Sequence, residues 1–324
     1  MARLRPPRLE GTFCLKDGRR LGYAEYGPAS GHPLLWFHGT PGARKQVPPE
    51  ARDLAYERKI RIIALERPGI GDSTPHAYEA IARWADDVEA FCDAKGIEVF
   101  DVVGLSGGGP YALACAHAFP ERISGVAILG GIAPATGPEA AEGGITTPTR
   151  IFSPILTVVR PPLNIAMRRL FRFLEPRAGR VLKIALGMMP PGDQRLFEDP
   201  ATRQMFIEDL VQGSRNQMQA IFLDGRLFGR DWGFSLKDIS SRVHMWYGDA
   251  DKIVPLEHGK HMAELIPDAV FRVRHDEGHL GGLGAFREVI DAIRDDSPET
   301  KAAPKKKAAP KRRTRKKSAT ARKR

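Results

Sequence analysis

Cysteine is scarce in this sequence. The 324 residues include three cysteines, Cys14, Cys92 and Cys115, which lie far apart and form neither a C-x-x-C motif nor a mixed Cys/His pattern. This number and spacing argue against a disulfide framework and against a cysteine-based metal site. The chain is long enough to bury a substantial hydrophobic core without such cross-links.

Long apolar runs are absent as well. No stretch reaches the roughly 18 apolar residues that cross a bilayer, and the basic segment 1–13 is not followed by the apolar region of a secretory signal. Hydrophobic residues make up 42% of the chain and aromatic residues 8%, which is typical of a soluble globular protein. The sequence therefore predicts a cytoplasmic protein that does not span a membrane.

Acidic residues are missing from residues 301–324, which contain thirteen of the 50 lysines and arginines. The first 300 residues then hold 37 basic and 39 acidic side chains, so the net charge of +11 belongs to the tail. Residues 297–324 have too few apolar side chains to offset chain entropy, and we expect them to be disordered. Their charge would support weak, salt-sensitive binding of DNA, RNA or anionic lipid; the alternative is a solvated extension with no dedicated partner.

The apolar segments that are present have the length of buried strands. They are nearly continuous rather than alternating, as in parallel strands covered on both faces. Helical patterns separate them, most clearly at 78–95, where Ile81, Val88 and Cys92 share one face. Strands are predicted at 33–39, 60–66, 99–105, 123–131, 243–248 and 269–275, and further helices at 109–118, 256–265 and 281–294. This alternation predicts an α/β fold with a mostly parallel sheet, preceded by a hairpin at 11–27.

The alternation is interrupted between 133 and 236. This part is rich in proline and methionine and has mainly helical patterns, so we expect a helical cap inserted into the core domain. One predicted helix places Leu163, Met167, Phe171 and Leu174 on an apolar face that would pack over the core, although similar helices also lie on membrane surfaces. The predicted domains are the core at 1–132 and 237–296, the cap at 133–236 and the tail at 297–324.

The clearest chemical motif is the G-x-S-x-G sequence Gly104-Leu105-Ser106-Gly107-Gly108, between a predicted strand and a predicted helix. In a nucleophile elbow the strand turns so sharply into the helix that side chains two residues before and after the serine would collide. The turn exposes the serine Oγ at the positive end of a helix and leaves the Gly107 amide free to bind a developing oxyanion. The motif predicts a nucleophilic serine; the alternative is an ordinary glycine-rich turn.

A serine hydroxyl needs a base, and the late sequence supplies one. His279 follows the strand predicted at 269–275, and Asp251 follows the strand predicted at 243–248. Parallel strands bring their carboxyl ends to one edge of a sheet, so the His279 imidazole can reach Ser106 and the Asp251 carboxylate can reach the imidazole. We therefore predict Ser106 as the nucleophile, His279 as its base and Asp251 as the acid that orients the imidazole.

Other residues have weaker claims to these roles. Asp249 is an alternative to Asp251, two residues earlier, although its closeness to the strand favours a turn role. His244 lies within a predicted strand, and His258 and His261 lie one turn apart on a predicted helix. Chemistry of this kind needs neither a metal nor an organic cofactor, and none is predicted.

The loop at 38–42, His-Gly-Thr-Pro-Gly, follows the first predicted parallel strand. Gly39 permits close approach of the backbone, and the amide of Thr40 is the natural donor because the next residue is a proline. We predict that Thr40 and Gly107 form the oxyanion hole and that Gly39 and Leu105 contact the substrate. The alternative is a plain Gly/Pro turn.

Taken together, the motifs resemble those of the α/β-hydrolase superfamily. The similarity extends over residues 11–295, and HGxPG with a serine nucleophile is similar to the branch of small esterases, lactonases and proline iminopeptidases. The motifs are HGTPG at 38–42, ERPGIGDS at 66–73, GLSGGG at 104–109, RDWGF at 230–234, YGDADKIVP at 247–255 and EGHL at 277–280. The resemblance implies an eight-stranded, mostly parallel sheet with a helical cap between the sixth and seventh strands.

The resemblance also implies roles for individual residues. Ser106, Asp251 and His279 match the triad, and Thr40 with Gly107 matches the oxyanion hole. In the ERPGIGDS motif, Arg67 and Asp72 match positions that hold the shape of a loop beside the site.

Two departures narrow the predicted activity. Proline iminopeptidases usually have HGGPG and GGSWG, which weakens a peptidase assignment here, and epoxide hydrolases and haloalkane dehalogenases have an aspartate in place of Ser106. The sequence therefore predicts a carboxylesterase-like serine hydrolase that cleaves an ester-like bond of a small, apolar substrate through an acyl-enzyme. The alternatives are a C–C bond hydrolase or aminopeptidase with the same triad, and a ligand-binding member of the fold without turnover.

Overall fold

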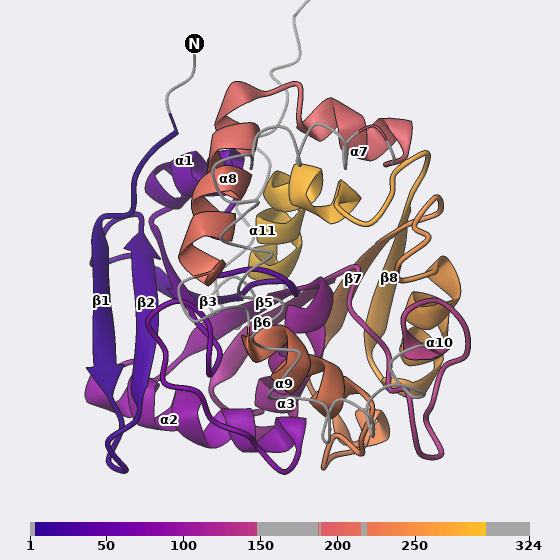
Figure 1. The fold of residues 1–324 in the computed structure, drawn as a ribbon, viewed down its shortest axis with the longest axis horizontal. Helices are drawn as coiled ribbons and strands as arrows, with labels where there is room; N and C mark the ends of the chain where they lie inside the picture. Colours follow the sequence, from indigo (N-terminus) through magenta and orange to yellow (C-terminus); the bar gives the residue numbers. More distant parts are fainter. Residues whose placement is uncertain (1–3, 148–186, 188, 215–218, 296–324) are drawn as a thin grey trace, which may run out of the picture.

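A central sheet with helices on both faces organises the protein (Figure 1). The computed structural model describes residues 4–147, 187, 189–214 and 219–295. Within them the sheet has the order β1-β2-β4-β3-β5-β6-β7-β8. The strands are β1 (Leu9–Cys14), β2 (Arg20–Tyr26), β3 (His32–Phe37), β4 (Ile60–Leu65), β5 (Phe100–Leu105), β6 (Ile123–Leu129), β7 (Val243–Gly248) and β8 (Ala269–Arg274). Strands β1, β2 and β4 are antiparallel neighbours and all other neighbours are parallel, which confirms the predicted α/β fold with its mostly parallel sheet.

The strands alternate along the chain with helices that cover the two faces of the sheet. Helices α1 and α11 pack on one face, and α2, α3 and α10 pack on the other. Their bounds are α1 (Pro49–Glu57), α2 (Trp84–Ala94), α3 (Gly109–Ala118), α10 (Leu256–Leu265) and α11 (Phe286–Asp295). Because both faces are covered, the central strands are apolar at almost every position, as their sequences predict.

Each face of the sheet has its own hydrophobic core. In β4, Ile62 packs toward the α1 and α11 side, whereas its neighbour Ile63 packs toward the α2 and α3 side. Trp84 is fully buried in the second of these cores, and Phe286 is fully buried in the first. Each fully buried large apolar side chain stabilises the fold by about 1.5–3 kcal/mol.

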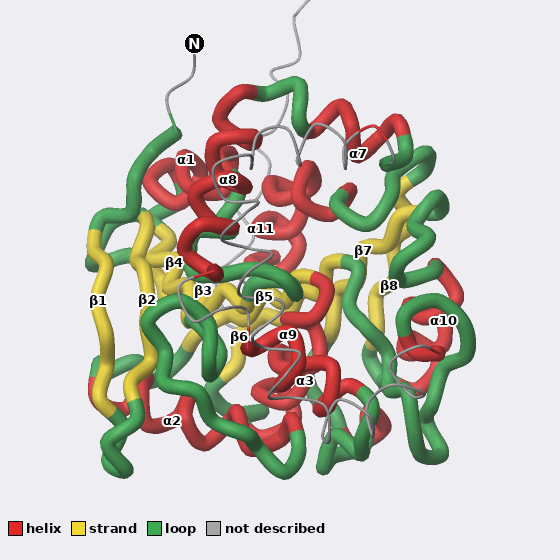
Figure 2. The backbone as a smooth tube through the Cα atoms, in the orientation of Figure 1, coloured by secondary structure: helices red, strands yellow, loops and turns green. Residues whose placement is uncertain are grey.

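The N-terminal hairpin forms one edge of the sheet (Figure 2). Its turn contains the predicted Asp17-Gly18 pair, and Gly18 has a φ of 85°, a conformation that glycine adopts without a steric cost. Strand β1 is largely exposed, whereas β2 is buried between β1 and β4. The hairpin therefore adds the antiparallel end to an otherwise parallel sheet.

Most predicted element bounds agree with the structure to within three residues. One difference is at 281–294, where the chain forms a 3-10 turn at Gly281–Ala285 before α11 begins at Phe286. Three of these five residues are glycines, which are poor formers of an α-helix. A second difference is at 78–95, where α2 begins only at Trp84, after a 3-10 turn at Ile81–Arg83.

The segment between β6 and β7 carries the helices α7 (Pro191–Leu196), α8 (Pro200–Ser214) and α9 (Gln219–Phe228). This is the place predicted for the cap, and we retain 133–236 as its proposed extent. The predicted helix that includes Leu163 and Leu174, and the predicted tail at 297–324, lie outside the described residues. No helix in the described ranges combines the length and the apolar character needed to cross a membrane.

Candidate active site

Ser106 lies on a sharp turn between β5 and α3. Its φ is 50°, a left-handed value that is uncommon for a residue with a side chain. A Cβ on Gly104 would lie 2.6 Å from the carbonyl oxygen of Gly108, and a Cβ on Gly108 would overlap the carbonyl oxygen of Phe37. Gly104 is therefore needed for the strand and the helix to meet at this angle, and Gly108 is needed for the turn to lie against the end of β3.

The structure brings Ser106, His279 and Asp251 together at the carboxyl edge of the sheet. The Oγ of Ser106 lies 2.7 Å from Nε2 of His279, and Nδ1 of His279 lies 2.7 Å from Oδ2 of Asp251. A carboxylate only accepts, so Nδ1 carries the proton and Nε2 is free to accept the serine proton. The Asp251 side chain is fully buried, and its Oδ1 accepts from the amides of Ile253 and Val254 at 2.8 and 2.9 Å.

Asp249 and the other histidines lie apart from this group. Asp249 instead accepts from the His275 ring and from the amide of Asp276, both at 2.9 Å, which holds the turn after β7. His244 contacts the Arg272 guanidinium within the sheet. His261 on α10 binds the carbonyl oxygen of Glu139 at 2.9 Å, and His258 on the same helix binds backbone carbonyls of the same loop.

The loop at 38–42 lies against Ser106. A Cβ on Gly39 would lie 3.5 Å from the Cβ of Ser106, and a Cβ on Gly107 would overlap the hydroxyl of Thr40. The amide of Gly39 donates to the Gln46 side chain at 2.6 Å, so it is already paired. Thr40 and Gly107, the predicted oxyanion donors, are therefore neighbours beside the serine.

Arg67 fixes the back of this loop. Its guanidinium donates to the carbonyl oxygens of His38 and Gly39 at 2.5 and 3.1 Å and to the Thr40 hydroxyl at 2.8 Å. It also pairs at 2.8 Å with Asp224 of α9. Arg67 is 1% exposed, so this role matches the shape-holding position that the sequence motif implied.

His38 is fully buried behind the same loop. Burial, with the nearby Arg67 guanidinium, holds the pKa of His38 well below its usual 6.5. The Gly39 carbonyl can only accept, so Nδ1 of His38 donates to it at 2.8 Å and Nε2 faces the Arg67 amide at 3.4 Å. His38 is therefore a neutral structural side chain of the loop.

Sequence motifs missed the aspartates that the inserted segment contributes. Asp193, Asp209 and Asp224 are each at most 2% exposed, and each contacts one of the loops around Ser106. Each lies in a different helix, α7, α8 or α9. None belongs to a motif, so only the three-dimensional contacts reveal them.

A cavity of about 440 Å³ opens above Ser106. Its described lining combines the site residues with apolar side chains of the inserted segment. The lining residues that this segment contributes include Met189, Pro190, Phe206, Ile207 and Leu210, and Leu105 and Leu280 come from the core. The predicted contacts Gly39 and Leu105 thus lie in the cavity wall, next to Ser106 and His279.

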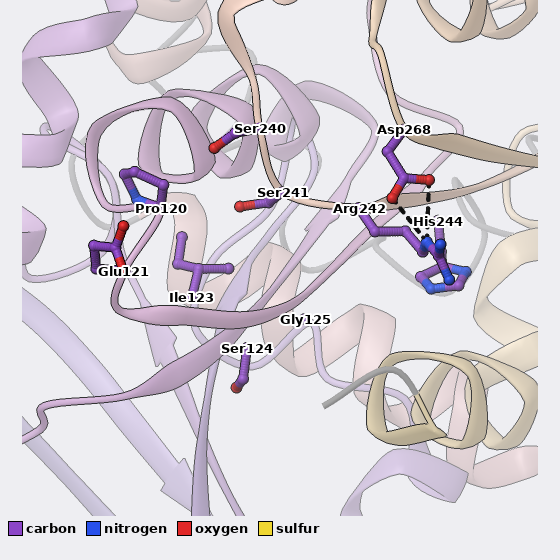
Figure 3. A pocket seen from close by; sticks show the side chains of 10 residues that line it. All are labelled: Pro120, Glu121, Ile123, Ser124, Gly125, Ser240, Ser241, Arg242, His244 and Asp268. Atoms are coloured by element: carbon purple, nitrogen blue, oxygen red, sulfur yellow. Dashed lines mark hydrogen bonds and ion pairs between the residues drawn. The ribbon is translucent and has the colours of Figure 1, made fainter. Parts of the chain in front are cut away.

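A second cavity, of about 300 Å³, lies at the amino ends of β6, β7 and β8, whereas Ser106 follows the carboxyl end of β5 (Figure 3). Figure 3 shows an ion pair between Arg242 and Asp268 at its rim, and Ser124 in its wall. Ser124 also lies near a histidine and an aspartate, but its hydroxyl and the Asp101 carboxylate both approach the same nitrogen, Nε2 of His32, at 3.3 and 3.2 Å. The imidazole therefore cannot pass a proton between them.

The fold and the arrangement at its carboxyl edge are those of an α/β hydrolase. A family model described as alpha/beta hydrolase fold matches residues 32–285, and the chain belongs to this family. The expectation drawn from the six motifs is thus confirmed, and the chain is a hydrolase of the α/β fold.

Individual relatives differ in how much of the chain they match. The chain is 26% identical over 279 residues to a 2-hydroxymuconate semialdehyde hydrolase from Pseudomonas putida. This match covers 83% of the chain and 87% of that protein. The chain is 32% identical over 131 residues to a proline iminopeptidase from Xylella fastidiosa, but this match covers 38% of the chain and 40% of the peptidase. The esterase RhEst1 from Rhodococcus sp. ECU1013 has a TM-score of 0.63 at 22% identity, covering 88% of this chain and 99% of that chain. This last likeness shows the shared fold.

Proposed function

We propose that the protein is a carboxylesterase-like serine hydrolase that cleaves an ester-like bond of a small, largely apolar substrate. Ser106 is the nucleophile, His279 the general base and Asp251 the group that orients the imidazole. One observation supports this function above the others: Ser106 Oγ, the two ring nitrogens of His279 and Asp251 Oδ2 form a continuous series of hydrogen bonds of 2.7 Å each.

The reaction proceeds in two halves. His279 takes the Ser106 proton as Oγ attacks the substrate carbonyl, and it then gives the proton to the leaving alcohol. The amides of Thr40 and Gly107 bind the negative charge of the tetrahedral intermediate. Water, activated by the same imidazole, then hydrolyses the acyl-enzyme and regenerates the serine.

The cavity supports a largely apolar acyl group. Its described wall is mainly aliphatic and aromatic, and the carboxylates of Asp193 and Asp209 within it already accept hydrogen bonds from backbone amides. A substrate with a free α-amino group would need an available carboxylate to replace its hydration. These contacts favour an esterase over the aminopeptidase alternative, and the short match to the iminopeptidase adds little support for the latter.

Hydrolysis of a carbon–carbon bond by the same triad is the second candidate. The similarity over 83% of the chain to a 2-hydroxymuconate semialdehyde hydrolase favours it. A substrate of that kind would use Ser106 and His279 in the same positions, so the two candidates differ in the leaving group. Side-by-side assays with a chromogenic ester and with that semialdehyde separate them.

The decisive experiment is the substitution Ser106→Ala, with Ser124→Ala as the matched control. Removal of the nucleophile should lower kcat for p-nitrophenyl esters by about 10⁴-fold or more, with an unchanged circular dichroism spectrum. Ser124→Ala, in the wall of the second cavity, should keep kcat within about threefold of the wild-type value. Full esterase activity of Ser106→Ala would reject the function, and absence of hydrolysis by a well-folded wild type would favour the ligand-binding alternative.

A further inference from the structure

Asp193 lies at the beginning of α7, in the inserted segment, and contacts the loop that carries His279. Its Oδ1 accepts from the amide of Gly278 at 3.0 Å, and its Oδ2 accepts from the amide of Leu280 at 3.3 Å. These two amides flank His279 directly. One carboxylate thus fixes the backbone on both sides of the proposed base.

Glycines allow α7 and the His279 loop to lie very close together at this contact. A Cβ on Gly278 would lie 2.5 Å from Asp193 Oδ2, and a Cβ on Gly192 would overlap the carbonyl oxygen of Asp276. Asp193 itself is 1% exposed. A buried carboxylate is costly unless it is hydrogen-bonded, so the two amides hold it in one position.

Asp193 also carries charge near the imidazole. Burial raises the pKa of Asp193, and the nearby Asp251 charge raises it as well. The two amides and the His279 ring act in the opposite direction and lower this pKa. The attraction between Asp193 and a protonated His279 is mutual. An ionised Asp193 therefore stabilises the imidazolium that forms when Ser106 is deprotonated.

The same arrangement recurs on the other side of the site. Asp209 of α8 accepts from the amides of Ala43 and Lys45 at 3.0 to 3.1 Å, just beyond the loop at 38–42. Asp224 of α9 binds the Thr40 hydroxyl within that loop. Each of the helices α7, α8 and α9 thus contributes one buried aspartate to a loop beside Ser106.

We propose that Asp193 is a positioning residue for His279, an inference that rests on the proposed function. The inserted segment then does more than cover the substrate: through Asp193 it holds the imidazole at the distance and angle needed to accept the Ser106 proton. A displacement of about 1 Å at such a contact can cost on the order of 100-fold in rate.

The test compares Asp193→Asn and Asp193→Ala with Asp199→Asn. Asp199 precedes α8 and accepts from the amides of Ala201 and Thr202 in the first turn of that helix, so it is an amide-binding aspartate of the same segment with a local role. For p-nitrophenyl butyrate we expect kcat to fall about 10-fold in Asp193→Asn and about 100-fold in Asp193→Ala, with KM within about threefold. Asp199→Asn should keep the wild-type kcat.

The comparison of kcat with KM separates positioning from mere stability. A displaced imidazole slows proton transfer and lowers kcat, whereas the cavity that binds the substrate is unchanged and KM stays near the wild-type value. A purely structural role would lower the melting temperature and leave kcat unchanged, and that result would overturn the proposal.

Two further measurements keep the outcome clear. If Asp193→Asn does not fold, Gly192→Ala reports on the same contact, since its Cβ pushes α7 off the His279 loop; wild-type kcat in that variant would also overturn the proposal. Labelling of wild-type Ser106 by a fluorophosphonate tests the serine hydrolase function independently. An unlabelled, inactive wild type refutes the proposed function, whereas a labelled, active wild type with a fully active Asp193→Asn refutes this inference alone.

Discussion

The hydroxyl of Thr40 donates to the carboxylate of Asp224 at 2.6 Å, across 184 positions of sequence. The same hydroxyl accepts from the Arg67 guanidinium at 2.8 Å, so it acts both as a hydrogen-bond donor and as an acceptor behind the loop. The Thr40 hydroxyl is thereby held by two protein partners, which leaves its amide available for the proposed role of oxyanion donor. A threonine in this position thus anchors the loop through its side chain.

This anchoring predicts the effect of Thr40→Val. Valine has the same shape but no hydroxyl, so Thr40 loses its side-chain bonds to Asp224 and Arg67. Arg67 keeps its bonds to the His38 and Gly39 carbonyl oxygens and its pairing with Asp224. We expect kcat for a p-nitrophenyl ester to fall about 10-fold to 100-fold, because the proposed oxyanion donor is no longer held in place. Thr40→Ser keeps the hydroxyl and should stay within about threefold; equal kcat values for the valine and serine variants would contradict the anchoring role.

The two aspartates after β7 should differ strongly. Asp251→Asn keeps the shape but favours the wrong imidazole tautomer, so kcat should fall on the order of 10⁴-fold. Asp249→Asn affects a turn that contacts the exposed His275 and should leave kcat within about threefold. Steady-state kinetics of the two purified variants would settle the assignment, and the reverse ranking would make Asp249 the acid.

Stability should depend on His38 at mildly acidic pH. The pKa of His38 is lowered in the folded protein, so below pH 6.5 the unfolded chain binds a proton that the folded protein does not. The free energy of unfolding therefore falls as the pH decreases below 6.5, by up to about 1.4 kcal/mol per pH unit. Above pH 6.5 this contribution is constant.

Urea unfolding at pH 5 and pH 7.5 measures this contribution. His38→Asn can still donate to the Gly39 carbonyl but does not titrate, so its stability should change less between the two pH values than that of the wild type. His275→Asn, which replaces a histidine whose side chain is 82% exposed, should behave like the wild type. A His38→Asn variant with the full wild-type pH dependence would show that this histidine is not the source.

Leu210 offers a test of the acyl pocket. It lies on α8 and lines the cavity above Ser106. Leu210→Trp should fill part of the roughly 440 Å³ and lower kcat/KM for octanoate esters by about 10-fold or more, while acetate esters change little. The ratio of kcat/KM for the two esters is the readout. An unchanged ratio would mean that the acyl group lies elsewhere.

The basic tail gives a prediction that is independent of catalysis. Residues 301–324 carry thirteen positive side chains and no acidic ones. Full-length protein should retard duplex DNA in a gel at low salt and lose this binding steeply as salt rises, whereas a chain ending at residue 296 should show no retardation. Esterase activity should be equal in the two proteins. Equal retardation by both would place the binding in the folded part.

Elements with a local sequence pattern could be predicted from the sequence alone. The buried strands show as continuous apolar runs, and Ser106, Asp251 and His279 follow strands in short, recognisable motifs. Helix α1 went unpredicted because Arg52, on its buried side, is fully buried and donates to backbone carbonyls of Arg5, Lys45 and Val47, so the helix lacks a simple apolar face. The hydrogen bonds of the buried Arg52 guanidinium replace the apolar contacts that a sequence pattern would have shown in this helix.

The buried aspartates of the inserted segment could not be predicted for a different reason. An aspartate in a helix is ordinarily a solvated surface residue, and nothing near Asp193 or Asp224 in sequence marks it otherwise. Their partners are far away in sequence, at Gly278, Leu280 and Thr40. Only the folded structure brings each carboxylate to the amide or hydroxyl whose hydrogen bond offsets the cost of burying it.

Burial of Arg67 has a consequence for the exchange of parts between related hydrolases. Its guanidinium is 1% exposed and its carboxylate partner, Asp224, comes from the inserted segment. A chimera that received this segment from a donor without an equivalent carboxylate would leave a cation stranded in the protein interior, at a cost of about 3–5 kcal/mol. A transplanted segment therefore keeps the fold stable only if it brings a carboxylate that can pair with Arg67.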